Sequence, residues 1–170
     1  GDGFDDLLIG TSTRSSYGSI YSPTPSYVIF GKASGFDAHL SMDELKGDTG
    51  FRIDNGDQKD LLGSTVSSAG DVNGDGFDDV IMGAEGYSFS YVLFGKANGF
   101  AATMDLSSLD GHDGFRLDGA GTSVSSAGDV NGDGFDDVIV TGIDITNASG
   151  SCYVIFGSNT GFDATLDVSD

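Results

Sequence analysis

The sequence predicts an all-β fold made of β-propeller blades, each a sheet of four short antiparallel strands. Three observations predict it. The string SSAGDVNGDGFDDVI occurs at residues 67–81 and again at 125–139, and a string of the form YV-[IL]-FG follows each copy. Both strings are rich in the β-branched and aromatic residues that strands favour. No window has the apolar spacing of a long helix, and the nearest candidate, Met42–Leu45, is at most one turn.

The complete unit contains four expected strands, bounded by clusters of Gly, Asp, Asn and Ser. In chain order they are Ser64–Ala69, Asp79–Gly83, Tyr91–Phe94 and Phe115–Leu117. Near-identical units of roughly 60 residues favour radial repetition over a sandwich.

Blade boundaries follow from the repeats. We expect a partial blade at 1–63, a complete blade at 64–122 and a partial blade at 123–170. A closed ring usually needs four to eight blades. About three blades therefore predict part of a larger ring, closed by further blades of the same chain or of another chain.

The segment between the first two strands of a blade, DVNGDGFDD, has the chemistry of a Ca²⁺ loop. Oxygen-bearing side chains occupy positions 1, 3, 5 and 9, and the backbone carbonyl at position 7 adds another oxygen. Glycines at positions 4 and 6 let the backbone curl so that these oxygens converge. Such hard oxygen ligands suit Ca²⁺ better than Zn²⁺. The expected ligands are Asp71, Asn73, Asp75, the Phe77 carbonyl and Asp79 in one loop, Asp129, Asn131, Asp133, the Phe135 carbonyl and Asp137 in the next, and Asp2, the Phe4 carbonyl and Asp6 in a truncated copy that we expect to bind weakly or not at all.

Three other interpretations of this loop were weighed. An EF-hand needs a Glu at position 12, which is Met82 or Val140 here, and flanking helices in place of strands. A nonapeptide calcium roll needs a nine-residue period that the chain lacks. A metal-free turn is disfavoured because the crowded carboxylates would repel one another without a cation.

Composition excludes several classes of partner and activity. With 27 acidic and 7 basic residues the net charge is −20, which argues against nucleic acid and anionic membrane surfaces. No apolar run is long enough to insert into a membrane. No nucleophile–base pair is evident, so we expect no enzyme activity. His39 and His112 are expected at the surface, and Cys152 is expected to be a small, at least half-buried filler.

The run AGDVNGDGFDDVIMGA, followed by SYVLFGK, resembles the FG-GAP repeat of integrin α-subunit propellers, in its bacterial form. The resemblance implies a seven-bladed ring, an extracellular or cell-surface location, and a role in adhesion or protein–ligand interaction. It also implies that the calcium ligands of the family correspond to the residues of the two complete loops.

A binding face is expected opposite the calcium loops, where the connections between second and third strands lie. These connections vary most and carry the candidate partner-binding residues Arg14, Tyr17, Tyr21 and Tyr87. The leading hypothesis is a non-catalytic adhesion module that binds a protein or glycan. The alternatives are an accessory propeller of a secreted hydrolase and a carbohydrate-binding lectin propeller.

Overall fold

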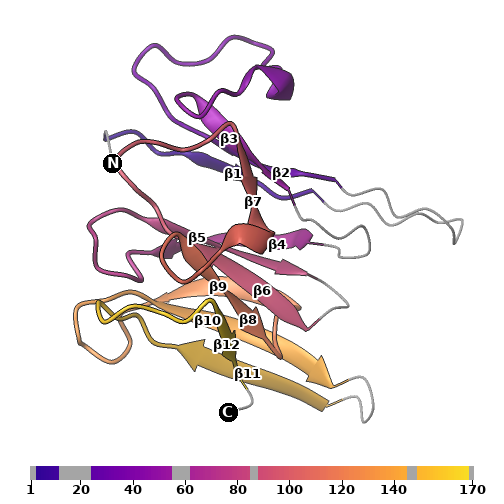
Figure 1. Ribbon diagram of the computed structural model, residues 1–170, viewed down its shortest axis with the longest axis vertical. Helices are drawn as coiled ribbons and strands as arrows, with labels where there is room; N and C mark the ends of the chain where they lie inside the picture. The colour runs from indigo at the N-terminus through magenta and orange to yellow at the C-terminus, as the bar shows by residue number, and fades with distance from the viewer. Residues whose placement is uncertain (1–2, 12–23, 55–61, 85–87, 145–148, 169–170) are drawn as a thin grey trace, which may run out of the picture.

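The computed structural model describes the chain except for residues 1–2, 12–23, 55–61, 85–87, 145–148 and 169–170. Its strands form three sheets that stack face to face (Figure 1). The first sheet has the order β1-β2-β3-β7, the second β12-β8-β6-β5-β4, and the third β11-β10-β9. The described residues contain no α-helix, only the single 3₁₀ turns η1 (Met42–Glu44) and η2 (Leu106–Ser108). The strands are β1 (Leu7–Ile9), β2 (Ser26–Ile29), β3 (Gly50–Asp54), β4 (Leu62–Gly70), β5 (Asp79–Ala84), β6 (Phe89–Leu93), β7 (Thr103–Asp105), β8 (Gly114–Asp118), β9 (Ser123–Gly128), β10 (Asp137–Asp144), β11 (Ser149–Ile155) and β12 (Thr165–Asp167).

The prediction of four-stranded antiparallel blades is confirmed. In the middle sheet, β4, β5, β6 and β8 pair antiparallel in that order, and each overlaps one of the four expected strands. The first sheet contains the second to fourth strands of a blade, and the third sheet contains the first to third. The ring size and the blade boundaries stay predictions.

A fifth strand, absent from the sequence prediction, extends two of the sheets. The segment β7 lies between β6 and β8 in the sequence, yet it pairs parallel with β3 of the preceding sheet. In the same way β12 follows β11 and pairs parallel with β8. The connections after β6 and β11 therefore cross to the preceding blade, so neighbouring blades are joined by backbone hydrogen bonds.

Two apolar cores lie between the stacked sheets, because strands alternate their side chains between the two faces. One core, between the first and second sheets, includes Ile53 and Met82, which are 1% and 0% exposed. The other, between the second and third sheets, includes Phe115 and Val138, both 0% exposed. The middle sheet therefore contributes side chains to both cores, and five of the six residues of β5 (Asp79–Ala84) are buried.

A trio of phenylalanines repeats at each junction between sheets. Phe51 of β3 stacks on Phe100, with ring centroids 4.6 Å apart, and Phe30 packs against both rings. At the next junction Phe115 stacks on Phe162, and Phe94 packs against both. Phe100 and Phe162 come from the segments that lead into the crossing strands β7 and β12. These segments are the GF-[DA]-A elements that recur in the sequence.

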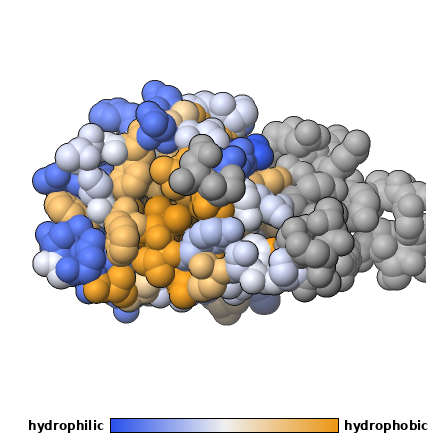
Figure 2. Space-filling model, turned by 90° about the horizontal axis from the view of Figure 1, so that it is seen from below, coloured by the Kyte–Doolittle hydropathy of each residue, from blue (hydrophilic) through white to orange (hydrophobic). Residues whose placement is uncertain are grey.

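The corresponding residues at the two ends of the stack are exposed. On the first blade Phe36, which occupies the repeat position of Phe100, is 45% exposed. On the third blade Phe156, which occupies the position of Phe94, is 54% exposed. Figure 2, which views the molecule from below, shows an apolar band across this end. The exposed large hydrophobic side chains of the third blade are Val130, Ile143, Val154 and Phe156.

One expectation about a single residue was wrong. Cys152 is exposed, not a filler, because it shares a strand face with Val154, which is 41% exposed, while the alternate residues Tyr153 and Ile155 pack against the core. Arg52 and Arg116 each form an ion pair with the Asp two residues further along the same strand, Asp54 and Asp118. Side chains at i and i+2 share one face of a strand, which makes this local pair possible.

Candidate metal centre

The two complete loops, 71–79 and 129–137, lie at the same edge of the stack, where the first strand of a blade turns into the second (left in Figure 1). Since the strands are antiparallel, the end of β5 and the start of β6 lie at the opposite edge, as do the end of β10 and the start of β11. The predicted binding face at this opposite edge stays a prediction. Arg14, Tyr17, Tyr21 and Tyr87 lie outside the described residues.

Loop 71–79 is curled by hydrogen bonds from its backbone to its own side chains. The carboxylate of Asp71 accepts the N–H groups of Asp75 (3.0 Å) and Gly76 (2.9 Å). Asn73 Oδ1 also accepts from Asp75 N–H (2.9 Å), and Asp75 Oδ1 accepts from Phe77 N–H (2.9 Å). These bonds hold the side-chain oxygens at positions 1, 3 and 5 against backbone N–H groups of their own loop.

Loop 129–137 repeats these internal bonds, since its sequence is identical, and adds one from the Gly132 N–H to Asp129 Oδ1 (2.6 Å). Asp129 accepts the N–H groups of Asp133 (3.1 Å) and Gly134 (2.9 Å), and Asn131 Oδ1 accepts from Asp133 N–H (2.9 Å). These N–H donors, led by Gly134, lower the pKa of the Asp129 carboxyl, so it stays ionised at neutral pH.

The last residue of each loop is a buried anchor. Asp79 is 1% exposed and accepts the N–H groups of Val72 (2.9 Å) and Gly95 (2.7 Å). Asp137 is 0% exposed and accepts those of Val130 and Gly157, both at 2.9 Å. Each carboxylate thus ties the start of its loop to the glycine that ends the third strand. The glycine of the YV-[IL]-FG string has a steric reason. A Cβ on Gly95 or Gly157 would collide with the backbone of the loop.

The acidic groups of loop 71–79 influence one another. Burial raises the pKa of Asp79 to about 7 from an ordinary 3.8, the N–H donors of Gly95 and Val72 oppose this, and the charges of Asp75 and Asp71 add to it. Burial and repulsion between carboxylates favour the protonated form of Asp79, and a bound cation would favour its ionised form instead.

The donor set therefore fits Ca²⁺ in its chemistry: it consists of carboxylate, amide and carbonyl oxygens, with charges close enough to repel. Across the described ranges, however, no three His, Cys, Asp or Glu side chains close around one point as finished ligands would. Residues Asp71, Asn73, Asp75 and Asp79, with the Phe77 carbonyl, are those that would hold the ion. Bound Ca²⁺ would supply charge neutralisation and a rigid link across the loop.

The anchor of the truncated copy is placed like the anchors of the two complete loops. Asp6 accepts the N–H of Gly31 (2.8 Å), as Asp79 and Asp137 do with their own glycines. Phe4 is 46% exposed, and Asp2 lies outside the described residues. The expectation of weak or absent binding here stays a prediction.

The residue at position 8 of the loop has a contact that the sequence analysis missed. Asp136 Oδ2 accepts the N–H of Asp71 (2.9 Å), and Asp136 N–H donates to the Asp71 carbonyl (3.1 Å). One blade's loop therefore holds the first residue of the preceding loop. The only signal in the sequence is that position 8 is Asp in all three copies.

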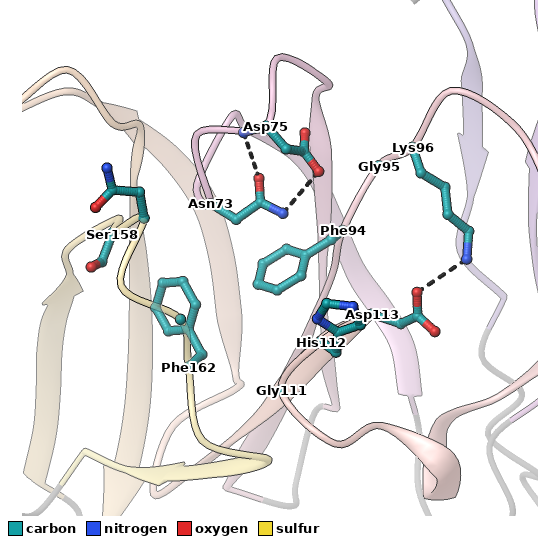
Figure 3. A pocket seen from close by; sticks show the side chains of 12 residues that line it. Asn73, Asp75, Phe94, Gly95, Lys96, Gly111, His112, Asp113, Ser158 and Phe162 are labelled. Carbon is teal, nitrogen blue, oxygen red and sulfur yellow. Dashed lines mark hydrogen bonds and ion pairs between the residues drawn. The ribbon is translucent and has the colours of Figure 1, made fainter.

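A pocket of about 420 Å³ opens beside loop 71–79, between the second and third blades (Figure 3). Phe94 and Phe162 line it, and the Lys96–Asp113 ion pair (3.0 Å) lies at one side. Its remaining polar side chains are Asn73, Asp75, His112, Ser158 and Asn159. His112 is exposed, as is His39, in agreement with their predicted surface positions.

These features define an array of propeller blades with an acidic loop at the start of each second strand. The family model for the FG-GAP repeat matches residues 62–102 and 120–149. The chain is also 30% identical over 145 residues to integrin alpha-4 of Xenopus laevis, an alignment that covers 82% of this chain. This chain contains FG-GAP repeats. It spans only 13% of the length of that relative, and the bacterial form of the repeat stays a prediction.

Proposed function

We propose that this chain is a calcium-stabilised, non-catalytic interaction module of the adhesion type, located at the cell surface or outside the cell. Its FG-GAP repeats and its similarity to an integrin α-subunit support the adhesion role and the location. No helix in the described ranges is long and apolar enough to cross a bilayer. The single observation that carries the calcium role is that each complete loop is curled by its own Asp and Asn side chains around a buried aspartate.

Calcium titration of the metal-free chain tests the stabilising role. We expect calorimetry to show two sites, and the melting temperature to rise with Ca²⁺ concentration. A ligand at a hundred times its Kd stabilises the folded state by about 2.7 kcal/mol per site. The paired variants Asp71→Ala and Asp129→Ala should each remove one site. A melting temperature that does not respond to Ca²⁺ would refute the proposal.

The exposed ends of the stack are proposed as docking surfaces for further blades of the same or another chain. Phe36 and Leu40 on the first blade occupy the positions of Phe100 and Met104, which are covered by a neighbouring sheet in the second. Within this chain, the corresponding surface of the second blade is covered by the sheet of the first blade. If a second copy supplies the blade, sedimentation should show association that Phe156→Lys weakens. A chain that stays monomeric at high concentration contradicts docking by a second copy.

A glycan ligand is the second candidate, and the pocket between the second and third blades favours it. Its apolar floor of Phe94 and Phe162 and its rim of hydroxyl, amide and carboxylate groups suit a sugar ring. A glycan array tests it, with Asn159→Ala and His112→Ala as pocket variants. Protein partners captured with no glycan bound would favour the adhesion role alone.

A further inference from the structure

Two loops of identical sequence meet unequal surroundings in this fold. Val72, at position 2 of loop 71–79, is 0% exposed, whereas Val130, at the same position of loop 129–137, is 56% exposed. Val72 belongs to the core between the second and third sheets, together with Val138 of β10. The next blade therefore covers loop 71–79. In the described part of the chain, no further blade covers loop 129–137.

Backbone hydrogen bonds reinforce this support. The Asp71 N–H and carbonyl both bond to Asp136, at 2.9 and 3.1 Å. The Val72 carbonyl accepts the N–H of Ser158 at 2.8 Å. The first two residues of loop 71–79, including its first expected ligand, are thus held by three bonds from the third blade.

Close packing leaves little freedom at this contact. Gly70 has φ = +75°, and a Cβ there would overlap the carboxylate of Asp136. A Cβ on Gly74 would overlap the ring of Phe135. A displacement of residues 135–136 is therefore transmitted to both halves of loop 71–79, since packed contacts of this kind have no spare volume.

Asp136 also lies between two expected ligands of its own loop, the carbonyl of Phe135 and the carboxylate of Asp137. Any cation that fixes these two groups also restrains the backbone of Asp136, whose N–H and carboxylate contact Asp71. The loops are thereby linked by a contiguous path: ligand, Asp136, then the backbone of Asp71.

We propose that Asp136 is a positioning residue that couples the two calcium sites, so that loop 71–79 binds more tightly than loop 129–137 and gains affinity when loop 129–137 is filled. The inference rests on the proposed calcium role. Loop 71–79 is the stronger site because Asp71, its first ligand, is already held by Asp136. Binding there costs less conformational entropy. By linkage, filling loop 71–79 raises the affinity of loop 129–137 by the same factor.

The test is an NMR titration of the whole chain with Ca²⁺, which follows each loop separately. The amides of Gly74 and Gly76 report loop 71–79, and those of Gly132 and Gly134 report loop 129–137. We expect two different midpoints, with the first pair titrating at lower Ca²⁺ concentration.

Three variants separate coupling from simple support. Asp133→Ala disables loop 129–137 while leaving Asp136 in place, and should weaken loop 71–79 by about fivefold or more, the lower end of typical coupling. Asp136→Ala should weaken loop 71–79 directly. In the Asp136→Ala background, Asp133→Ala should change loop 71–79 no further, whereas a purely structural role of Asp136 predicts the same effect of Asp133→Ala in both backgrounds. Asp78→Ala is the matched control, because Asp78 occupies the same loop position but is exposed.

The outcomes are distinct. Equal midpoints in the wild-type chain, or a loop 71–79 that ignores Asp133→Ala, would overturn the coupling while leaving calcium binding intact. Glycine signals that never respond to Ca²⁺ would overturn the proposed function itself, and the coupling with it. If Asp136→Ala does not fold, the comparison of wild type with Asp133→Ala still decides, since Asp133 is exposed.

Discussion

The ring of Phe162 lies flat on the ring of Phe115, with 4.4 Å between centroids and 7° between planes. Phe115 belongs to the fourth strand of the middle blade, and Phe162 to the connection of the third. The same pair recurs one blade earlier as Phe51 and Phe100, at 4.6 Å and 6°. The second and third blades therefore each contact the preceding blade through one stacked aromatic ring and one short parallel strand.

Removing that ring should destabilise the array. We expect Phe162→Ala to lower the free energy of unfolding by about 2–4 kcal/mol, through lost burial and a lost aromatic contact. The matched control is Phe36→Ala, at the same repeat position but 45% exposed, with an expected effect within about 0.5 kcal/mol. Urea unfolding of both variants measures the difference. Similar losses in the two variants would show that the stacking contributes little.

The buried anchor of loop 129–137 should matter even without calcium. Asp137→Ala leaves the N–H groups of Val130 and Gly157 without their acceptor, and each lost partner in a buried site costs about 1–3 kcal/mol. Asp163→Ala removes an exposed carboxylate and serves as the control. Unfolding in calcium-free buffer measures both. An Asp137→Ala chain as stable as the control would mean that water replaces these bonds at little cost.

Stability of the calcium-free chain should fall as the pH rises from about 4 to 7. The pKa of Asp79 is raised to about 7 when folded and is near 3.8 otherwise, so between these values the folded state binds more protons than the unfolded state. Stability then decreases with pH, by on the order of 2–4 kcal/mol over the window.

Unfolding at a series of pH values tests this, with Asp79→Asn as the variant that cannot titrate and should show a flatter profile. Added Ca²⁺ should restore stability near pH 7, since it binds the ionised carboxylate. A profile that rises with pH in calcium-free buffer contradicts the assignment.

Phe94 and Phe156 occupy the same position of the repeat but differ in burial, at 6% and 54% exposed. We expect Phe94→Ser to cost about 3–5 kcal/mol, as for other buried aromatic truncations. Phe156→Ser should change stability by less than about 1 kcal/mol and should reduce the binding of an apolar dye. If Phe156→Ser is as damaging as Phe94→Ser, then the end of the third blade is covered in solution.

Much of the fold was predictable because the repeat is local information. The strings around Asp71 and Tyr91 specify two strands and the loop chemistry, since alternating apolar residues and flanking turn residues act within a few positions of one another. The oxygens at positions 1, 3 and 5 were predictable for the same reason. The four strands of the middle blade were placed correctly from these strings.

The contacts that each repeat makes with neighbouring blades were not predictable from its own sequence. Thr103–Asp105 pairs with the preceding sheet, because the connection of one blade crosses over its neighbour, and nothing in those three residues states which strand they join. Asp136 binds Asp71 only because stacking places the two loops side by side.

The sequence by itself determined the blades, their strands and the oxygen-rich loops, because those depend on residues close together in the chain. Only the tertiary structure decided that two identical DVNGDGFDD loops are unequal, with Val72 buried and Val130 exposed. The physical reason is that the surroundings of a loop come from the next blade, through contacts of residues far apart in the chain. Identical segments therefore acquire different burial and different hydrogen bonds.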